Sequence, residues 1–488
     1  MKRIFNILTM SGIILLTSCS KEITDYNNIT TSPLKVSSGS LFANATINLS
    51  DEMANTNVNN NNFRLWTQYW TQTTYRDETR YNINSRSISD SWWSVFYKDV
   101  IKDLVEASKV TQTETLTLTP AQIQNRVAIN DMMIVYSYYT LLSTYGNIPY
   151  TDALNIQIIQ PKYDDAAVIF DSISIKLDNA LANLDETETG YGSSDLLLHD
   201  DISGWKKFGY SLKMRMGMLI ADVNPTKSTT MVVDAAPYVI SSNDENIMMK
   251  YLAAPPNTNP VWVELVQSQR HDFVGAAPFI DSLLAYNDSI RLAFFFEKNA
   301  DTLYLGQAQG VKVPNYKDYS VPSNKVADPL MPHTFFSYAE MELLKAEAIE
   351  RGYPIAGTAQ GHYNAAIDAS FQEWGGSSAD AQAYRSQPSV NYLTAPGNYK
   401  QKIGLQSWFA LYNRGFDAWT QYRRLDFPVL QVPDLGSTNP FNPDEADGIL
   451  VRMTYPVIEQ NVNAANYSAA SAAIGKDQIT QKLWFDAY

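Results

Sequence analysis

The stretch SYAEMELLKAEAIERGYPIAGTAQGHYNAAIDASFQEWGG, residues 337–376, predicts two amphipathic helices joined by a short turn. Ser337 is the expected N-cap, and Glu340 three residues later predicts a capping box at the start of the first helix. Gly352 and Pro354 end that helix, and apolar residues at spacings of three and four define the second one. Two such helices form an antiparallel hairpin that buries one face only, so further hairpins are expected to stack on it.

The same periodicity recurs on both sides of a long irregular segment. Helical patterns cover residues 90–108, 121–145, 165–185, 205–221, 337–351 and 359–374. Residues 225–335 lack the pattern and contain recurrent Pro and Gly, as is typical of excursions that carry binding surface. We therefore expect a mainly α fold: tetratricopeptide-like helical hairpins over about 90–222 and 336–488, with a loop-rich lobe and a few short strands between them. The sequence has no strict repeat of about 34 residues, so the likeness to tetratricopeptide proteins lies in the arrangement of the helices and not in a repeated sequence. Residues 36–488 are expected to form a single domain.

The N-terminus predicts export and lipidation. Two basic residues precede a short apolar run, which ends in Leu16, Thr17, Ser18 and Cys19, the only cysteine in the chain. The run is too short for a membrane span and suits a signal peptide. This ending resembles the lipobox of bacterial lipoproteins, which implies a signal peptide over 1–18, acyl chains such as palmitate on Cys19 and a flexible tether over 19–35. An ordinary secretory signal is the alternative.

Net charge and the catalytic inventory exclude several function classes. Without the two basic residues of the signal peptide, 35 basic residues face 51 acidic ones, a net charge of −16. This acidity argues against nucleic acid and anionic membrane surfaces as targets.

The zinc-protease motif HExxH, the hydrolase elbow GxSxG, the phosphate loop and the dinucleotide-binding motif are all absent. We expect no catalytic residues, no metal and no cofactor, although the sequence leaves a structural calcium open.

A few polar motifs have a structural explanation that outweighs a catalytic one. In RHDF, residues 270–273, a histidine beside an aspartate indicates a hydrogen-bonded structural residue. The acidic residues of the 337–351 helix are expected to cap it or to bond to a neighbouring helix. Arg423 and Arg424 at a helix end are expected to complement the helix dipole.

The segment FRLWTQYWTQTTYRDETRYN, residues 63–82, combines many aromatic rings with few aliphatic side chains. Helical spacing of its first rings favours core burial, whereas flat amphipathic rings beside amide and guanidinium donors suit a sugar or a peptide. We leave both interpretations open. The candidate ligand-binding residues of this segment are Trp66, Tyr69, Trp70, Tyr75, Arg76 and Tyr81, and the irregular segment adds Trp262 and Tyr304.

Seven motifs in one order along the chain resemble the SusD/RagB family of outer-membrane nutrient-binding lipoproteins, and most closely its second SusD-like subgroup. They are YYTLLSTYGNIPYTDAL (138–154), GWKKFGYSLKMRMGM (204–218), FSYAEMELLKAEA (336–348), YNAAIDAS (363–370), GFDAWTQYRRLDFPVL (415–430), VRMTYPVIEQNVNAANY (451–467) and KLWFDAY (482–488). Asp417 stands where the family usually has Glu.

The resemblance implies a non-catalytic protein at the cell exterior. Such a protein captures an oligosaccharide and delivers it to a SusC-like, TonB-dependent outer-membrane transporter. A peptide-binding member of the family, as in the RagB branch, is the first alternative. A lipid-anchored hydrolase would need two carboxylates in one cleft, and a helical scaffold without a small ligand would bury every ring of residues 63–82. The motifs are mostly structural and transfer no ligand residues.

Overall fold

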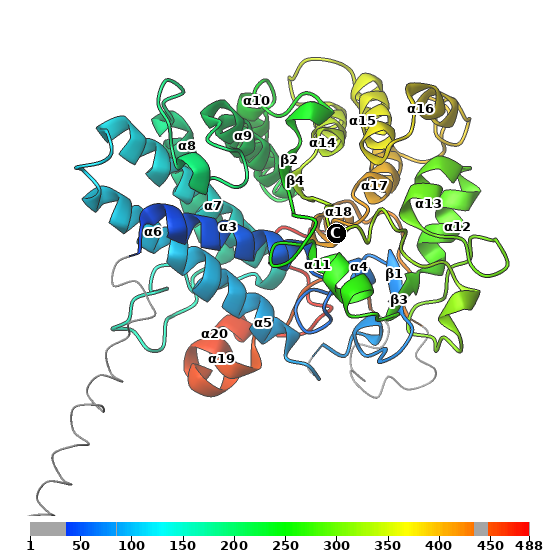
Figure 1. The fold of residues 1–488 in the computed structure, drawn as a ribbon, viewed down its shortest axis with the longest axis horizontal. Helices are drawn as coiled ribbons and strands as arrows, with labels where there is room; N and C mark the ends of the chain where they lie inside the picture. Colours follow the sequence, from blue (N-terminus) through cyan, green and yellow to red (C-terminus); the bar gives the residue numbers. More distant parts are fainter. Residues whose placement is uncertain (1–35, 84, 434–447, 488) are drawn as a thin grey trace, which may run out of the picture.

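The computed structural model describes residues 36–83, 85–433 and 448–487 of the chain (Figure 1). The predicted signal peptide, Cys19 and the tether over 19–35 lie outside these ranges. None of the helices in the described ranges combines the length and the apolar character that a membrane span needs.

Helices dominate the described chain, which confirms the predicted mainly α fold. The α-helices are α3 (Ser38–Ala54), α4 (Phe63–Trp66), α5 (Ile88–Ser94), α6 (Lys102–Thr113), α7 (Pro120–Tyr145), α8 (Ala166–Asn183), α9 (Ile202–Leu219), α10 (Pro225–Ala235), α11 (Pro260–Trp262), α12 (Ala277–Ala285), α13 (Ser289–Phe295), α14 (Tyr338–Glu350), α15 (Ala359–Trp374), α16 (Ser378–Arg385), α17 (Tyr399–Ala410), α18 (Gly415–Leu425), α19 (Val457–Val462) and α20 (Ala464–Ala473). A π-helical turn, Val95–Ile101, joins α5 to α6. The irregular segment 225–335 contains the short helices α10 to α13.

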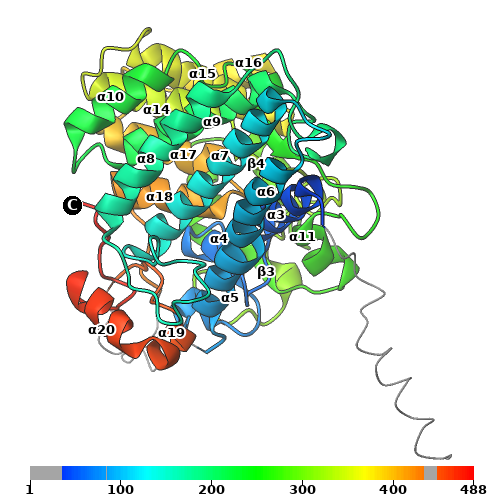
Figure 2. The same cartoon turned by 90° about the vertical axis from the view of Figure 1, so that its left-hand side faces the viewer.

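Consecutive helices pack as pairs, most extensively α14 with α15, α7 with α8, α9 with α10 and α6 with α7. Figure 2 shows α8, α7, α6 and α3 lying side by side. Helix α14 also contacts α9 and α17, and so joins the pairs on either side of the irregular segment. The helix ends follow local chemistry: Thr119 and Gln122 form a capping box on α7, and Gly375, with a φ of 103°, ends α15.

Two small antiparallel sheets tie distant segments together. In the first sheet, β1 (Trp70–Gln72) pairs with β3 (Phe273–Gly275). In the second sheet, β2 (Ile247–Met249) pairs with β4 (His333–Phe336), with one irregularity in register. The first sheet therefore connects the aromatic segment near the N-terminus to the loop-rich lobe.

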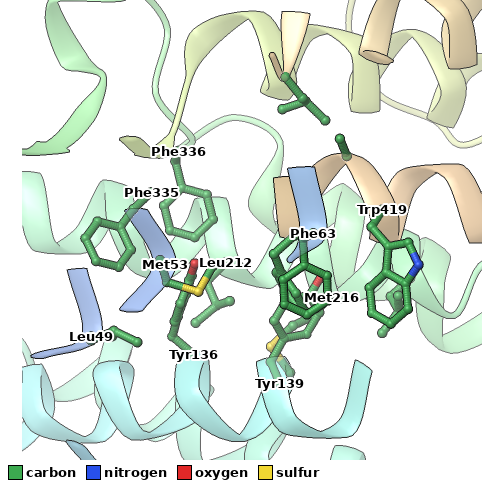
Figure 3. Close-up of a cluster of buried hydrophobic side chains, with 14 of the residues drawn as sticks. Leu49, Met53, Phe63, Tyr136, Tyr139, Leu212, Met216, Phe335, Phe336 and Trp419 are labelled. Atoms are coloured by element: carbon green, nitrogen blue, oxygen red, sulfur yellow. The ribbon is translucent and has the colours of Figure 1, made fainter. Parts of the chain in front are cut away.

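The main hydrophobic core collects side chains from elements far apart in the sequence. Figure 3 shows Leu49, Phe63, Tyr136, Met216 and Trp419 in one buried cluster. They come from α3, α4, α7, α9 and α18. Because each helix contributes one apolar stripe, burial of these side chains is the main source of stability for the scaffold.

A buried network of charges lies among α9, α14 and α18. Arg215 Nε lies 2.6 Å from Glu340 Oε1, and Arg414 Nη2 lies 2.5 Å from Glu340 Oε2. Burial raises the pKa of Glu340, but the charges of Arg215 and Arg414 outweigh it and hold that pKa below its ordinary value. Of the two hydrogen bonds in the predicted capping box of α14, only the one accepted by the Ser337 side chain is present. Ser337 caps the helix, whereas the Glu340 carboxylate turns to the two arginines because a buried charge needs a buried partner.

The two arginines at the end of α18 also act across helices. The Arg424 guanidinium donates to both carboxylate oxygens of Glu347 at 2.5 Å. Arg423 donates to the Ser143 carbonyl at 2.6 Å and to the Val451 carbonyl at 3.0 Å. The prediction that these side chains complement the dipole of their own helix missed these long-range partners, which only the packing of α18 brings near.

Candidate functional site

Four of the five rings predicted in residues 63–82 belong to the core. Trp66, Tyr69, Trp70 and Tyr81 are between 0 and 3% exposed. Trp66 Nε1 donates to the Glu78 carbonyl, Tyr69 donates to the Trp408 carbonyl, and Trp70 Nε1 donates to the Tyr412 hydroxyl. The four rings are buried, and the N–H or O–H groups of three of them donate hydrogen bonds inside the protein. These side chains therefore offer no surface to a ligand in the described structure.

Tyr75 is the exception, with 70% of the residue exposed. The pairing of β1 with β3 explains the position of Tyr75, because the chain that follows β1 continues alongside the chain that precedes β3. Just beyond the strand ends, the Thr73 amide donates to the Asp272 carbonyl at 2.8 Å, and the Thr73 hydroxyl donates to the His271 carbonyl at 2.6 Å. The next residues of the first strand therefore lie beside residues 270–272 of the second.

A shallow depression of about 110 Å³ lies at this junction. It is lined by Val58, Gln72, Thr74, Tyr75, Arg86, Arg270 and Asp272, which we call the Tyr75 surface. Of the residues predicted from the sequence, Tyr75 alone lines it. The lining residues come from four separate stretches of the chain, so only the tertiary fold brings them together.

Hydrogen bonds and an ion pair fix the backbone around Tyr75. The Gln72 side-chain amide donates to the Tyr75 carbonyl at 2.8 Å and to the Glu78 carboxylate at 2.6 Å. Arg86 Nε lies 2.6 Å from Glu78, and the Arg86 guanidinium lies 5.8 Å from the centre of the Tyr75 ring. Burial raises the pKa of Glu78, although Gln72 and Arg86 oppose that effect. Tyr75 is thus an exposed ring on a fixed support.

Backbone strain occurs in this region, as it does in several other parts of the described chain. Several residues other than glycine adopt a positive φ there: Gln68 (59°), Tyr75 (50°), Tyr81 (62°), Ser87 (52°) and Gln269 (56°). Each such residue costs of order 1 kcal/mol or more, and clusters of them are found where a structure holds a functional side chain in place. The strain around Tyr75 supports a ligand-binding role for this surface.

A second pair of rings lies on the neighbouring loop. The His271 ring stacks on Tyr316, with the ring centres 4.1 Å apart and the planes 12° from parallel. The RHDF interpretation is therefore wrong: His271 is exposed, and the Asp272 carboxylate pairs with Arg270 at 2.6 Å instead of with the histidine. Arg86 and Tyr316 were not singled out in the sequence, and Arg270 was noted only as part of RHDF. The β1–β3 pairing brings Arg270 beside Tyr75, whereas Arg86 lies in the same segment as Tyr75 and pairs with Glu78 there.

The remaining predicted residues lie apart from the depression. Arg76 donates to the Gly310 carbonyl at 2.9 Å and so fastens this segment to the loop-rich lobe. Trp262 is half-buried at the end of α11, and Tyr304 is half-buried on a loop, with Lys298 Nζ 5.6 Å from its ring centre. Neither of these two aromatic side chains lines the Tyr75 surface.

The Tyr75 surface combines an apolar ring with hydrogen-bonding groups. An exposed ring offers an apolar face, and the surrounding amide, hydroxyl, guanidinium and carboxylate groups offer hydrogen bonds. Asp272 is the one carboxylate among the residues that line the depression, so this surface lacks a pair of acids for glycosidic cleavage. Within the described ranges, no group of three or more acidic, histidine or cysteine side chains is arranged to hold a metal ion.

Known proteins resemble this chain in sequence and in fold. The sequence profile of the SusD-like family, described as "Starch-binding associating with outer membrane", matches residues 27–456. No curated protein matches the chain. Among solved structures, a chitin-binding protein has a TM-score of 0.79 at 23% identity, with 92% of this chain and 100% of that chain covered.

Two further structures show the same fold. A chitin-binding SusD homolog from Flavobacterium johnsoniae has a TM-score of 0.77 at 20% identity, over 92% of this chain and 98% of that chain. A SusD homolog from Bacteroides uniformis has a TM-score of 0.79 at 23% identity, over 93% of this chain and 100% of that chain. The resemblance inferred from the seven sequence motifs is confirmed, and the chain belongs to the SusD-like family of proteins associated with the outer membrane.

Proposed function

We propose that this protein binds an oligosaccharide on the Tyr75 surface and does not cleave it. The observation that carries the proposal is the exposed Tyr75 ring, held on a strained and hydrogen-bonded turn beside polar side chains. A pyranose ring has one apolar face and a rim of hydroxyl groups. It therefore matches a flat aromatic ring surrounded by donors and acceptors.

The family supports a glycan as the ligand class. Its description names starch, and two of the structural relatives are named for chitin binding. Both polymers are chains of hexoses that present repeated pyranose faces, so oligomers of glucose and of N-acetylglucosamine are the first candidates.

The proposal places the chain at the outer membrane, anchored through acyl chains on Cys19 and facing the cell exterior. There it would pass its glycan to a SusC-like, TonB-dependent transporter. The lipobox-like sequence before Cys19 and the family's association with the outer membrane support this arrangement. Two or more acyl chains would hold the protein stably on the membrane, whereas a single chain would bind only marginally.

Isothermal titration of the non-acylated Cys19→Ser chain tests the ligand class. The titrants are maltohexaose, chitohexaose and a mixture of peptides. We expect binding to at least one oligosaccharide, and we expect Tyr75→Ala to weaken it by about tenfold, or about 1.4 kcal/mol. Tyr238→Ala is the matched control, since Tyr238 is also an exposed tyrosine, at 56%, and does not line the depression.

Three results would overturn the proposal. Binding of peptides without any oligosaccharide would favour the RagB-like alternative. Release of shorter sugars by the purified chain would favour a hydrolase. Oligosaccharide binding that Tyr75→Ala and Tyr238→Ala leave equally strong would place the glycan site elsewhere on the protein.

A further inference from the structure

A second depression, apart from the Tyr75 surface, lies between the end of α12 and the first turns of α17. Its volume is about 250 Å³. Its walls include Tyr286, Pro396, Gln401, Lys402, Phe427 and Val429, and we call it the Lys402 pocket. Figure 1 shows α12, α15 and α17 on the same side of the molecule. Cavities for drug-sized ligands begin at about 300 Å³, so the Lys402 pocket has room for a smaller ligand, such as a single sugar ring.

Two aromatic rings of the pocket are held in place by their neighbours. Tyr286 lies at the end of α12 and Phe427 follows α18, and both are half-buried. Asn287, the residue after Tyr286, donates to the Gln387 side chain at 3.0 Å. Gly404 of α17 lets the Phe427 backbone approach closely, because a Cβ there would lie 2.8 Å from the Phe427 carbonyl oxygen. The two rings therefore offer fixed, partly exposed apolar faces to a ligand.

Lys402 presents a positive charge that no side chain of the pocket neutralises. Its Nζ donates to the Tyr392 carbonyl at 2.7 Å and lies 5.2 Å from the centre of the Tyr392 ring. Within residues 36–83, 85–433 and 448–487, no carboxylate lies within ion-pair distance of this ammonium. An ammonium has three N–H donors, so donors remain for a ligand beside the bond to Tyr392.

The local charge is opposite in sign to the net charge of the whole chain, which is −14. One lysine and no Asp, Glu or Arg line the pocket. At physiological ionic strength, charges are screened beyond about 8 Å, so a ligand in the pocket responds to Lys402 more than to distant carboxylates. The pocket therefore favours a ligand with an anionic group.

Neutral donors line the pocket from three parts of the chain. They belong to Tyr286 at the end of α12, to Ser389 after α16 and to Gln401 of α17. The side-chain oxygen of Gln401 already accepts from the Asn398 amide at 2.8 Å in the capping box of α17, so its NH₂ group is the part left for a ligand. Donors spread over three elements suit a ligand with several hydroxyl groups, such as a sugar.

We infer that the Lys402 pocket binds the ring of a hexuronic acid. The carboxylate of the sugar pairs with Lys402, and its apolar face lies on the Tyr286 or Phe427 ring. Its hydroxyl groups bond to Ser389 and Gln401. A neutral hexose lacks the charge that pairs with Lys402, and a plain aromatic or aliphatic acid leaves the neutral donors without partners. The pocket shares no lining residue with the Tyr75 surface, so the inference goes beyond the proposed function and does not depend on it.

Isothermal titration of the non-acylated Cys19→Ser chain with sodium glucuronate tests the inference. Glucose, benzoate and N-acetyl-leucine are the comparison ligands, since each lacks either the carboxylate or the hydroxylated ring. We expect glucuronate to bind with a Kd of about 1 mM, which corresponds to average contacts for a ligand of this size. We expect each comparison ligand to bind about tenfold more weakly.

Two variants locate the binding. Lys402→Met keeps the apolar stem and removes the charge, so we expect it to weaken glucuronate binding about tenfold. Val429→Trp places a large side chain at the wall of the pocket, and we expect a loss of similar size. Val429 is 78% exposed, so this second variant is expected to fold even if Lys402→Met does not. Lys98→Met is the control, because the Lys98 side chain is 71% exposed and lies outside the pocket.

Several outcomes would overturn the inference. They include absence of glucuronate binding by the wild-type sequence and glucuronate binding that Val429→Trp and Lys402→Met leave unchanged. Glucose binding as tight as glucuronate binding would remove the role of the charge. Tighter binding of benzoate or N-acetyl-leucine would identify an apolar acid or the carboxyl end of a peptide as the ligand. Glucuronate binding that Tyr75→Ala removes and Lys402→Met preserves would place the sugar acid on the Tyr75 surface.

Discussion

Arginine–carboxylate pairs occur in two very different regions of this molecule. Between α14 and α18, Arg424 and Glu347 are 3% and 0% exposed. On the Tyr75 surface, Arg270 and Asp272 are 45% and 23% exposed. The same chemical pair has a structural role in the first region, because water does not reach either charge and each is stabilised by the other. In the second region water competes with the pair, so either partner can turn to a ligand.

The difference follows from desolvation. Burial raises the pKa of Glu347, but the charges and hydrogen bonds of Arg424 and Arg351 lower it further than burial raises it, so the carboxylate stays ionised. Removal of one partner from such a site leaves an uncompensated buried charge. An exposed pair contributes little to stability, since water replaces a lost partner.

The largest expected effect is that of Glu347→Ala in the buried region. The substitution leaves Arg424 and Arg351 without their shared carboxylate, and we expect the free energy of unfolding to fall by about 3–5 kcal/mol. Urea unfolding monitored by tryptophan fluorescence measures it. Loss of less than about 1 kcal/mol would contradict the structural role assigned to the network.

A smaller effect is expected for Asp272→Ala on the Tyr75 surface. The change removes one partner of the exposed Arg270 guanidinium, which keeps a contact with Glu264 at 3.9 Å and access to water, so we expect the free energy of unfolding to change by less than about 1 kcal/mol. Oligosaccharide affinity should change by more than stability does, because the substitution alters a lining side chain of the proposed site. The same urea titration and isothermal titration measure both quantities, and a loss of stability comparable to that of Glu347→Ala would remove the contrast between the two regions.

The smallest expected effect is a pH dependence at the rim of the helical scaffold. His362 Nδ1 lies 2.6 Å from the Glu342 carboxylate, and this hydrogen bond raises the pKa of His362 against the opposing effect of burial. A raised folded-state pKa stabilises the protein fully below the unfolded value of about 6.5, and the contribution disappears as pH rises through the folded-state pKa.

We therefore expect His362→Gln to lower the free energy of unfolding more at pH 6 than at pH 9. Thermal unfolding at a series of pH values between these limits measures the difference. An effect of the substitution that is larger at pH 9 than at pH 6 would show that the Glu342 contact does not favour the charged imidazole.

Most of the helical scaffold was predictable because its signals are local. The apolar stripe of Phe170, Ile173 and Leu177 gave α8 to within two residues at each end, and the glycine after Trp374 gave the end of α15. The capping box on α14 was half wrong, since a local pattern cannot show that Glu340 meets two arginines from other helices. The α3 helix, before residue 90, was not predicted, because its apolar spacing is diluted by Asn, Thr and Ser. The helical spacing of the first rings in residues 63–82 was right only as far as Trp66, since α4 ends there and Trp70 begins β1.

The candidate site was only partly predictable. The aromatic segment was recognised, but its composition could not separate the ring that stays exposed from the four that are buried. Spacing along one segment indicates which side chains share a face, and it does not indicate what packs against that face. Arg270 was not predicted as a site residue for the same reason, as the pairing of β1 and β3 brings it beside Tyr75. Tyr316 contacts this region by stacking on His271, and Arg86 by pairing with Glu78, and neither contact has a signal in the sequence.

The sequence by itself determined the family, the helical hairpins and the segment that contains the exposed ring, because periodicity, capping and turn residues act between near neighbours in the chain. Tertiary structure alone decided which aromatic rings lie inside, which charges are buried together and which lysine lines a pocket without a carboxylate. Those outcomes depend on contacts between residues far apart in the sequence, where the balance of desolvation and pairing is fixed by packing and not by any local pattern.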